Sequence, residues 1–300
     1  MSGAPPAPDA GAKRRTSPFG DALIRLAIAA LKLLARLPYP LFRPIGEAVG
    51  SLLWVVARPR RRVTLINLRL CMPALSEQER HRLGRRHFQY FARSFFDRFI
   101  VWFGTEQRIR QLVSLEGFEH LAPYRGKPVI LLAPHFCGID AGGLRLQLDV
   151  EACSMYANQK SELLSEVMTQ GRSRFNGARM YLRNDGLRPV IRELRNGVPF
   201  YFLPDMDLGP RDAIFVPFFG VPAATVTSVA RLARITGTTT DGYRMRMYPA
   251  WTDYPVDDLP AATRWMNAFI EDRVREMPAQ YLWSHKRFKT RPPGEPGFYR

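Results

Sequence analysis

The 300-residue sequence has little cysteine, little lysine and no long uninterrupted hydrophobic run. Its three cysteines, Cys71, Cys137 and Cys153, are far apart and form no C-x-x-C pair. Neither a disulfide framework nor a zinc ribbon is indicated, so we expect a reducing compartment and thiols that pack in the core. A chain of this length can bury a large core without disulfides or a structural metal.

Acidic side chains are also scarce. The sequence holds 27 Asp and Glu against 44 Lys and Arg, a net charge of +17, while a hydrophobic share of 46% excludes a disordered basic chain. This excess predicts an anionic partner, which is nucleic acid, phospholipid head groups, or acidic proteins and phosphorylated substrates. Arginine provides nearly all the cations and favours bidentate phosphate contacts, although a high-GC genome produces the same bias.

The N-terminus lacks the continuous apolar core of a secretory signal. Residues 1–18 are rich in Pro, Ala and Gly, which predicts a disordered tail. Residues 19–63 predict a membrane-associating helical segment. Within it, the apolar stretch 22–37 is interrupted by three cations and falls short of the ~20 apolar residues that a spanning helix needs.

These three cations, Arg25, Lys32 and Arg36, share one helical face while apolar side chains cover much of the rest. The pattern is typical of a helix that lies in a bilayer surface. A second apolar piece, residues 45–57, runs into a cationic collar at 58–62 that suits an anionic leaflet. The alternatives are two core-packing helices of a soluble domain, or a short or tilted span.

Residues 64–112 have the pattern of amphipathic helices. Ser76 followed by Glu79 predicts a capping box at the start of one of them. Four phenylalanines recur at helical spacing, which favours one apolar face packed in the core over a ligand site. They are Phe88, Phe91, Phe95 and Phe99.

Beyond Gly117, strand-like apolar runs alternate with helical segments. Gly and Pro bound the runs, as they bound buried strands. This order predicts an α/β fold with a mixed, mostly parallel sheet flanked by helices. The predicted strands are residues 127–135, 152–156 and 199–205, and the predicted helices are 161–176 and 186–196.

The first candidate site residues stand at the carboxyl end of the strand 127–135, where open α/β sheets place their sites. His135 and Asp140 are five residues apart and would diverge by about 140° on an ideal helix. If the chain turns at Gly138, Asp140 can hold one imidazole nitrogen and leave the other as a general base. His285 lies in a basic run, which favours a structural or phosphate-binding role.

Two further carboxylates, Asp205 and Asp207, follow the strand 199–205. A D-x-D pair can bind Mg²⁺, but no phosphate loop or nucleotide motif accompanies it. The alternative is pairing with nearby cations such as Arg172, and we predict neither a metal nor another cofactor. The next stretch, residues 214–225, is predicted to be an apolar loop.

In their order and spacing, these residues resemble the bacterial lipid A biosynthesis acyltransferases of the late lauroyl or myristoyl type, within the wider glycerolipid acyltransferase superfamily. The resemblance runs from about residue 20 to the C-terminus, and residues 64–300 would form the acyltransferase domain. It rests on Asn67-Leu68, Cys71-Met72-Pro73, Ser76 to Arg80, His135-x4-Asp140, Gly171-Arg172-x-Arg174, Pro204-Asp205-x-Asp207-x-Gly209, Phe215 to Thr225, Trp265-Met266-Asn267 and Gln280 to Pro292.

The resemblance implies transfer of a fatty acyl chain from acyl carrier protein to a hydroxyl of a Kdo-linked, phosphorylated lipid A precursor. The reaction would take place on the cytoplasmic face of the inner membrane, in contact with inner-membrane lipids. His135 would be the general base and Asp140 its orienting partner. Arg172 and the D-x-D carboxylates Asp205 and Asp207 would contact substrate.

The residue types fit this chemistry. An aliphatic hydroxyl needs a base as it attacks, and a thioester leaves well enough to need no metal. Arg172 and Arg174 suit a sugar phosphate, and the apolar residues 215–221 suit an acyl groove. Backbone N–H groups near Gly138 or Gly220 are candidates for binding the tetrahedral oxyanion.

One segment departs from the family pattern. After Gly237, family members usually continue through an apolar strand, but this sequence passes directly to residues 238–243 and is about ten residues shorter. The segment therefore pairs differently, or the chain is a damaged variant. Two rival functions are an acyltransferase for another glycolipid or glycerolipid, and a non-enzymatic basic protein that binds membrane or nucleic acid. Because the cations are dispersed and no recognised binding motif is present, we expect no nucleic acid partner.

Overall fold

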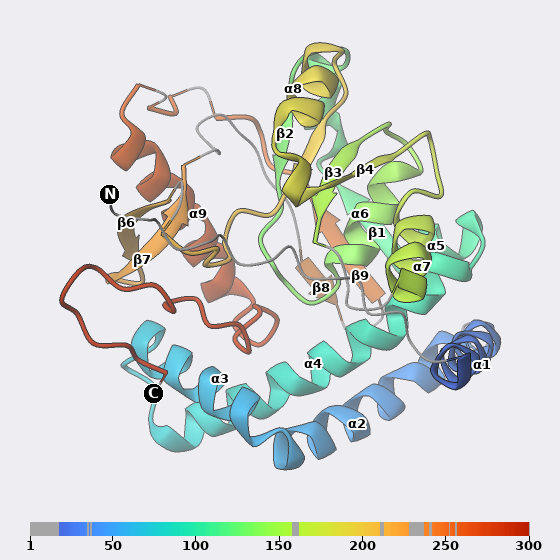
Figure 1. Cartoon of the computed structure of the whole chain (residues 1–300), viewed down its shortest axis with the longest axis horizontal. Helices are drawn as coiled ribbons and strands as arrows, with labels where there is room; N and C mark the ends of the chain where they lie inside the picture. Colours follow the sequence, from blue (N-terminus) through green and yellow to red (C-terminus); the bar gives the residue numbers. More distant parts are fainter. Residues whose placement is uncertain are drawn as a thin grey trace, which may run out of the picture.

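The computed structural model describes residues 18–299 except residues 35, 37, 158–161, 211–212, 228–236, 240–241, 252 and 256. The predicted tail, residues 1–18, lies outside the described residues apart from Pro18, where the first helix begins. The described part is a mixed α/β fold with a parallel sheet flanked by helices (Figure 1). This confirms the fold class predicted from the sequence.

The central sheet is parallel and has the strand order β2-β5-β3-β4. Adjacent residues of β2 point to opposite faces, so Leu131 joins the core beneath α6 while Ile130 packs beneath α8. Because the strands are parallel, their carboxyl ends meet at one edge. These elements are β2 (Ile130–Leu132), β5 (Phe200–Phe202), β3 (Cys153–Tyr156), β4 (Arg179–Leu182), α6 (Ile139–Gln147) and α8 (Arg188–Arg195).

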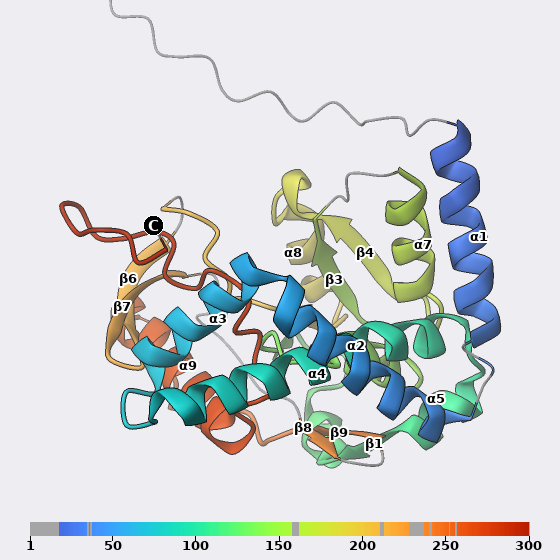
Figure 2. The same ribbon diagram turned by 90° about the horizontal axis from the view of Figure 1, so that it is seen from below.

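Residues 18–103 form a layer of helices beside this sheet. Its long members, α2 and α4, run antiparallel and in close contact (Figure 2). Glycine makes this contact possible, because a Cβ on Gly50 would lie 2.4 Å from the Cα of Gln89. The elements are α1 (Pro18–Leu34), η1 (Tyr39–Leu41), α2 (Phe42–Val56), α3 (Arg58–Cys71) and α4 (Glu77–Phe103).

The two faces of α2 differ. One face packs on α4, in line with the core-packing alternative, and the other exposes Leu52, Val55 and Val56 by 60% each. Among the helices of the described residues, none combines the length and the apolarity that crossing a membrane requires.

Helix α4 begins as predicted. The Ser76 side chain accepts from the Glu79 N–H, and the Glu79 carboxylate accepts from the Ser76 N–H, so the capping box is confirmed. The predicted core face of four phenylalanines is wrong in part. Phe88 and Phe99 are buried, but Phe91 and Phe95 are 40% and 45% exposed. Phe91 instead lines a cavity that the sequence pattern does not reveal.

The apolar loop predicted at residues 214–225 is also wrong, because the stretch forms a hairpin of β6 (Ala213–Phe218) and β7 (Val221–Val226). Phe219 and Gly220 at its tip both have positive φ, 50° and 77°, as in the tight turns that match the twist of paired strands. The hairpin packs on α9 (Leu259–Glu276). Its prolines are tolerated because a two-stranded hairpin consists of edge strands only.

A third sheet has the strand order β1-β9-β8. The segment after Gly237 thus pairs with β1 (Val113–Glu116) and does not enter the central sheet, while residues 228–236 and 240–241 lie outside the described residues. The remaining elements are α5 (Glu106–Leu112), η2 (Phe118–Tyr124), α7 (Glu162–Arg172), η3 (Arg183–Asp185), β8 (Gly237–Thr239) and β9 (Gly242–Arg246). All three cysteines are free and buried, as predicted.

Candidate active site

His135 follows β2 and is held by a carboxylate from the neighbouring strand. Its backbone N–H donates to both oxygens of Asp205, at 3.1 and 3.0 Å, and its ring nitrogen Nδ1 lies 2.7 Å from Asp205 Oδ1. Asp205 follows β5, which pairs directly with β2. Because an ionised carboxylate only accepts hydrogen bonds, Nδ1 carries a proton, and in the neutral imidazole Nε2 therefore has the lone pair.

Asp205 is suited to support a charged imidazole. Its side chain is 1% exposed, and burial by itself raises the pKa of Asp205. The charge of His135 and the hydrogen bonds from His135 outweigh burial, so the pKa of Asp205 lies below its ordinary value. The carboxylate therefore stays ionised at neutral pH. The resemblance implied a substrate contact for Asp205. Its contact with His135 was not predicted, because the adjacency of β2 and β5 is not visible in the sequence.

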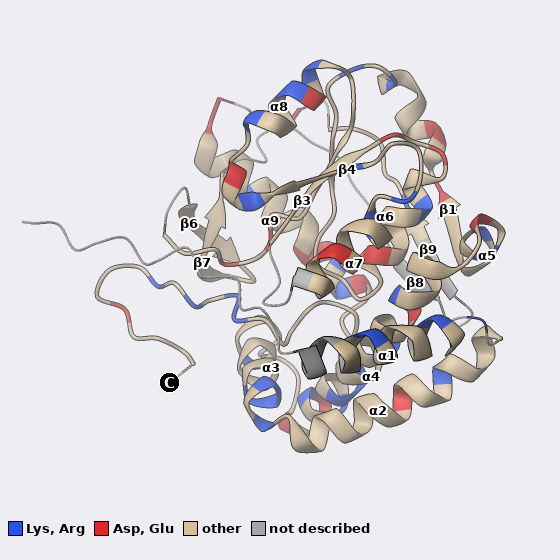
Figure 3. Cartoon of the chain, turned by 45° about the vertical axis from the view of Figure 1, so that its right-hand side comes forward, with Lys and Arg blue, Asp and Glu red and all other residues tan. Residues whose placement is uncertain are grey.

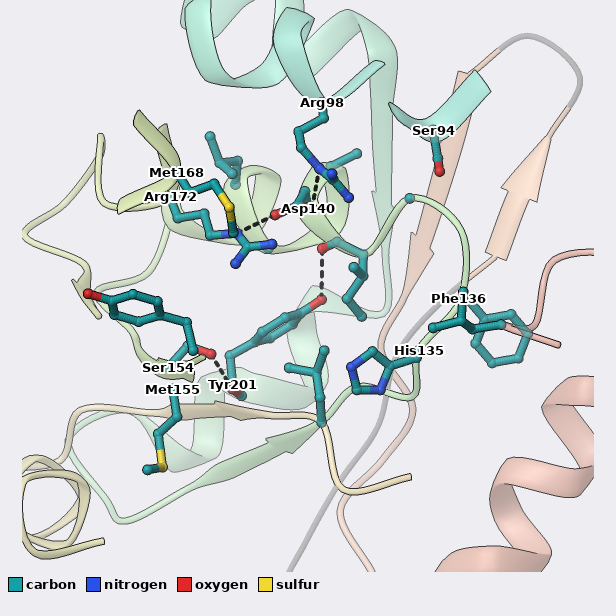
Figure 4. A pocket seen from close by; sticks show the side chains of 18 of the residues that line it. Ser94, Arg98, His135, Phe136, Asp140, Ser154, Met155, Met168, Arg172 and Tyr201 are labelled. Atoms are coloured by element: carbon teal, nitrogen blue, oxygen red, sulfur yellow. Dashed lines mark hydrogen bonds and ion pairs between the residues drawn. The ribbon is translucent and has the colours of Figure 1, made fainter. Parts of the chain in front are cut away.

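Asp140 lies in the first turn of α6 and does not contact the imidazole, which corrects the predicted His135–Asp140 pair. Its Oδ2 accepts from Arg98 Nε at 2.7 Å and its Oδ1 from Arg172 Nε at 2.6 Å (Figure 4). The chain does turn at Gly138, with φ of 90°. Two guanidinium charges nevertheless attract the carboxylate more strongly than one imidazole does.

The two arginines also set the protonation of Asp140. Burial raises the pKa of this carboxyl, but the charges of Arg172 and Arg98 and their hydrogen bonds outweigh burial and hold the pKa well below its usual range. Arg172 was predicted from the sequence, whereas Arg98 was missed. Arg98 lies between Phe95 and Phe99, in a stretch that was interpreted as a core face.

His135, Asp140 and Arg172 line one cavity of about 390 Å³. Figure 4 shows His135 at one end of it and Met155 and Met168 toward the other, with the arginines along one wall. The apolar part of the lining comes from α4, α6, α7 and the strand ends. It includes Phe91, Leu144, Met155, Met168, Met180 and Leu208. The residues 215–221 that were expected to line an acyl groove belong to the hairpin and do not line this cavity; Phe218, Phe219 and Val221 join the core cluster that includes Met266 and Ile270 of α9.

Arg174 and Asp207, two predicted substrate residues, do not line this cavity. Arg174 donates to the carbonyls of Val101 and Gly104 at 3.0 and 2.9 Å, and so satisfies the last turn of α4. Asp207 is buried and accepts from the Thr290 N–H and hydroxyl at 2.6 and 2.7 Å. These contacts are structural, since they join one part of the chain to another.

The D-x-D pair does not form a shared metal site. Asp205 is used by His135, and Asp207 by Thr290 and Gly209. Across the described residues, no group of three or more His, Cys, Asp or Glu side chains is arranged to hold a metal ion. His285 has a structural contact, because its Nε2 accepts from the Asp207 N–H at 3.2 Å.

The family model of the bacterial lipid A biosynthesis acyltransferase matches residues 13–290. The chain belongs to the bacterial lipid A biosynthesis acyltransferase family. This lipid A biosynthesis acyltransferase is 32% identical to the lipid A biosynthesis lauroyltransferase of Escherichia coli over 288 residues, which cover 91% of the chain and 94% of the relative.

Two other relatives from Escherichia coli are similar to this chain over most of its length. The lipid A biosynthesis palmitoleoyltransferase is 32% identical over 91% of this chain and 92% of its own length. The lipid A biosynthesis myristoyltransferase is 32% identical over 90% of this chain and 88% of its own length. The protein is therefore an acyltransferase enzyme of lipid A biosynthesis, and the resemblance inferred from its motifs is confirmed.

Proposed function

We propose that this acyltransferase moves a fatty acyl chain from acyl carrier protein to a hydroxyl of a Kdo-linked lipid A precursor, with His135 as the general base. The observation that carries the proposal is the imidazole of His135, held by Asp205 through Nδ1, at the end of a largely apolar cavity. A base that is fixed on one side and open on the other suits activation of an alcohol.

The reaction needs one proton to move twice. His135 Nε2 takes the proton of the acceptor hydroxyl while the hydroxyl oxygen attacks the thioester carbonyl carbon. The tetrahedral intermediate then collapses, the carbon–sulfur bond breaks, and the thiolate leaving group takes the proton back from the imidazolium. Asp205 stabilises the imidazolium between these steps, because its buried carboxylate is ionised.

The cavity wall supplies a place for the fatty acyl chain. Its methionines and its leucines give an apolar surface, and methionine adapts to flexible ligands. Asp140 acts on the arginines in this proposal and not on the imidazole. By binding both Nε atoms it fixes Arg98 and Arg172 at the same wall.

The two substrates are anionic, and the enzyme is strongly cationic. Lys and Arg are spread over α3, α4, α8 and the C-terminal segment, with fewer Asp and Glu among them (Figure 3). Such a positive field favours encounters with an acidic carrier protein and with an anionic membrane.

We place the enzyme on the cytoplasmic face of the inner membrane. Contact with a membrane is supported by the exposed apolar side chains of the N-terminal helices, Leu26 and Leu33 on α1 and Leu52, Val55 and Val56 on α2. Large apolar side chains exposed together mark an interaction surface. Vesicle flotation measures membrane binding. Replacing Leu52, Val55 and Val56 by Ser should reduce the fraction of the enzyme that is recovered with anionic vesicles.

The function is tested by incubating the purified enzyme with acyl carrier proteins that carry C10 to C16 chains and with a tetra-acylated, Kdo-linked precursor. We expect a penta-acylated product by mass spectrometry. His135→Ala should lower kcat by about 10²- to 10⁴-fold with unchanged folding. Wild-type turnover by this variant would refute the base, and an acyl chain gained by a different glycolipid would refute the acceptor.

A further inference from the structure

We propose that Arg98 and Arg172 together bind a phosphate group of the substrate through their guanidinium Nη groups. Arg98 is a substrate-binding residue that neither the motifs nor the family assignment identifies. The proposal rests on the proposed function and adds the chemical group that this wall of the cavity recognises.

The geometry of the two arginines leaves their outer donors available. Each uses Nε for Asp140, at 2.7 Å from Arg98 and 2.6 Å from Arg172. Among the described residues, no protein acceptor takes a hydrogen bond from the Nη groups of either side chain. Two guanidinium groups that meet on one carboxylate present four Nη atoms, which match the several acceptor oxygens of a phosphate.

Arg98 comes from α4 and Arg172 from the last turn of α7, so two separate helices deliver the pair. The guanidinium of Arg98 also lies over the rings of Phe95 and Trp102, at 5.7 and 5.6 Å. These contacts fix the plane of the group without neutralising its charge. The side chains of Arg98 and Arg172 are 27% and 24% exposed, so a ligand in the cavity can reach them.

The charge balance of the wall is positive. The cavity lining holds Arg98, Arg172 and Arg183 against two aspartates, Asp97 and Asp140. Asp97 is already close to buried Arg93, with 3.6 Å between Arg93 Nε and Asp97 Oδ2. The lining thus has one carboxylate, Asp140, to balance three guanidinium groups, and an anionic ligand would balance the excess.

Both substrates carry phosphate. The acceptor has sugar phosphates, and the carrier protein has the phosphodiester of its pantetheine arm. Two amide units separate that phosphodiester from the thioester, so it would lie outside a cavity of about 390 Å³ that also holds the reacting thioester. We therefore assign the arginine pair to the acceptor phosphate and let the experiment decide between the two sources.

The experiment measures the dissociation constants of two matched acceptors in detergent micelles, the Kdo-linked tetra-acylated disaccharide with and without its phosphates. Arg98→Gln should weaken binding of the phosphorylated acceptor by about 10- to 100-fold and leave the dephosphorylated one unchanged. Arg98→Lys keeps the charge and should recover part of the affinity. Arg85→Gln removes the same charge from an exposed position on the same helix and should change neither value.

A second arm compares an acyl-phosphopantetheine with the acyl-pantetheine that lacks the phosphate. If Arg98→Gln affects only the phosphorylated donor, the arginine pair holds the donor phosphate. Equal effects on phosphorylated and dephosphorylated ligands, or no effect on any, would overturn the proposal and leave Arg98 as a support for Asp140. If the wild type binds neither acceptor, the proposed acceptor is wrong and the donor arm alone decides on the arginine pair.

Discussion

The cavity wall and the hairpin region both contain arginines, but these arginines have different roles. At the wall, Arg98 and Arg172 each give one nitrogen to Asp140 and keep the others directed at the cavity. In the hairpin region, buried Arg287 donates to the Ala224 carbonyl and the Thr225 hydroxyl, both at 2.8 Å. An arginine thus marks a binding site when the protein leaves some of its donors unused beside an apolar cavity.

The two aspartates of the D-x-D motif show the same contrast within three residues. Asp205 holds the imidazole of His135, whose other nitrogen is open to substrate. Asp207 binds Thr290 and Gly209 and so ties the loop after β5 to the C-terminal segment. In the proposed mechanism one carboxylate serves the reaction and its neighbour serves the scaffold, and the first two predictions below test this division.

The largest effect is expected for Asp205→Asn. An amide cannot stabilise the imidazolium and can donate a hydrogen where Nδ1–H needs an acceptor, so kcat should fall by about 10²- to 10⁴-fold. Asp140→Asn should mainly raise the acceptor KM, because it frees the arginines and leaves the base in place. Steady-state kinetics of both variants separate the two roles. A kcat of Asp205→Asn close to that of the wild type would place the catalytic support elsewhere.

Some residues of the candidate site can be predicted from the sequence, whereas the contacts that support them cannot. His135 and Arg172 are identifiable because each stands in a motif. Asp205 and Arg98 act through contacts to residues 70 and 42 positions away, and those depend on the order of the strands and on the packing of α4. Three strands of the central sheet, β2, β3 and β5, were predictable from apolar runs, whereas β4 was missed. The hairpin was missed because its two prolines resemble a loop, and Phe91 because a cavity interrupts the core face of its helix.

Asp207→Ala should act on stability and leave the chemistry intact. Its carboxylate accepts from two backbone N–H groups and one hydroxyl, and losing them should lower the free energy of unfolding by about 3 kcal/mol. Asp272→Ala removes an exposed carboxylate on α9 and should change it by less than about 1 kcal/mol. Urea denaturation compares the two. If Asp207→Ala is as stable as the control but has lost its kcat, Asp207 belongs to the reaction.

The pH dependence of the free energy of unfolding should also depend on buried histidines with structural contacts. Burial lowers the pKa of His285 from 6.5 to about 4, and its Nε2 accepts from the Asp207 N–H only while unprotonated. Between pH 6.5 and 4 the unfolded chain binds a proton that the folded chain does not, so stability falls as the pH falls, by up to about 3 kcal/mol. Buried His87, whose pKa is also lowered to about 4, adds to the same slope. His285→Gln should flatten the slope in denaturation curves recorded across this range, and an unchanged slope would assign it to other groups.

The smallest effect concerns the two faces of α2. Gly50→Ala raises helix propensity by about 1 kcal/mol, but its Cβ would lie 2.4 Å from the Cα of Gln89 and 2.5 Å from the carbonyl oxygen of Phe88. Because both neighbours are backbone atoms, α2 must shift off α4, and we expect a net loss of about 1–2 kcal/mol. Leu52→Ala, on the exposed face, should change unfolding by no more than about 0.5 kcal/mol and should reduce vesicle binding. If Leu52→Ala were the more destabilising change, the exposed face would be packed against protein, and the proposal that it meets a membrane would fail.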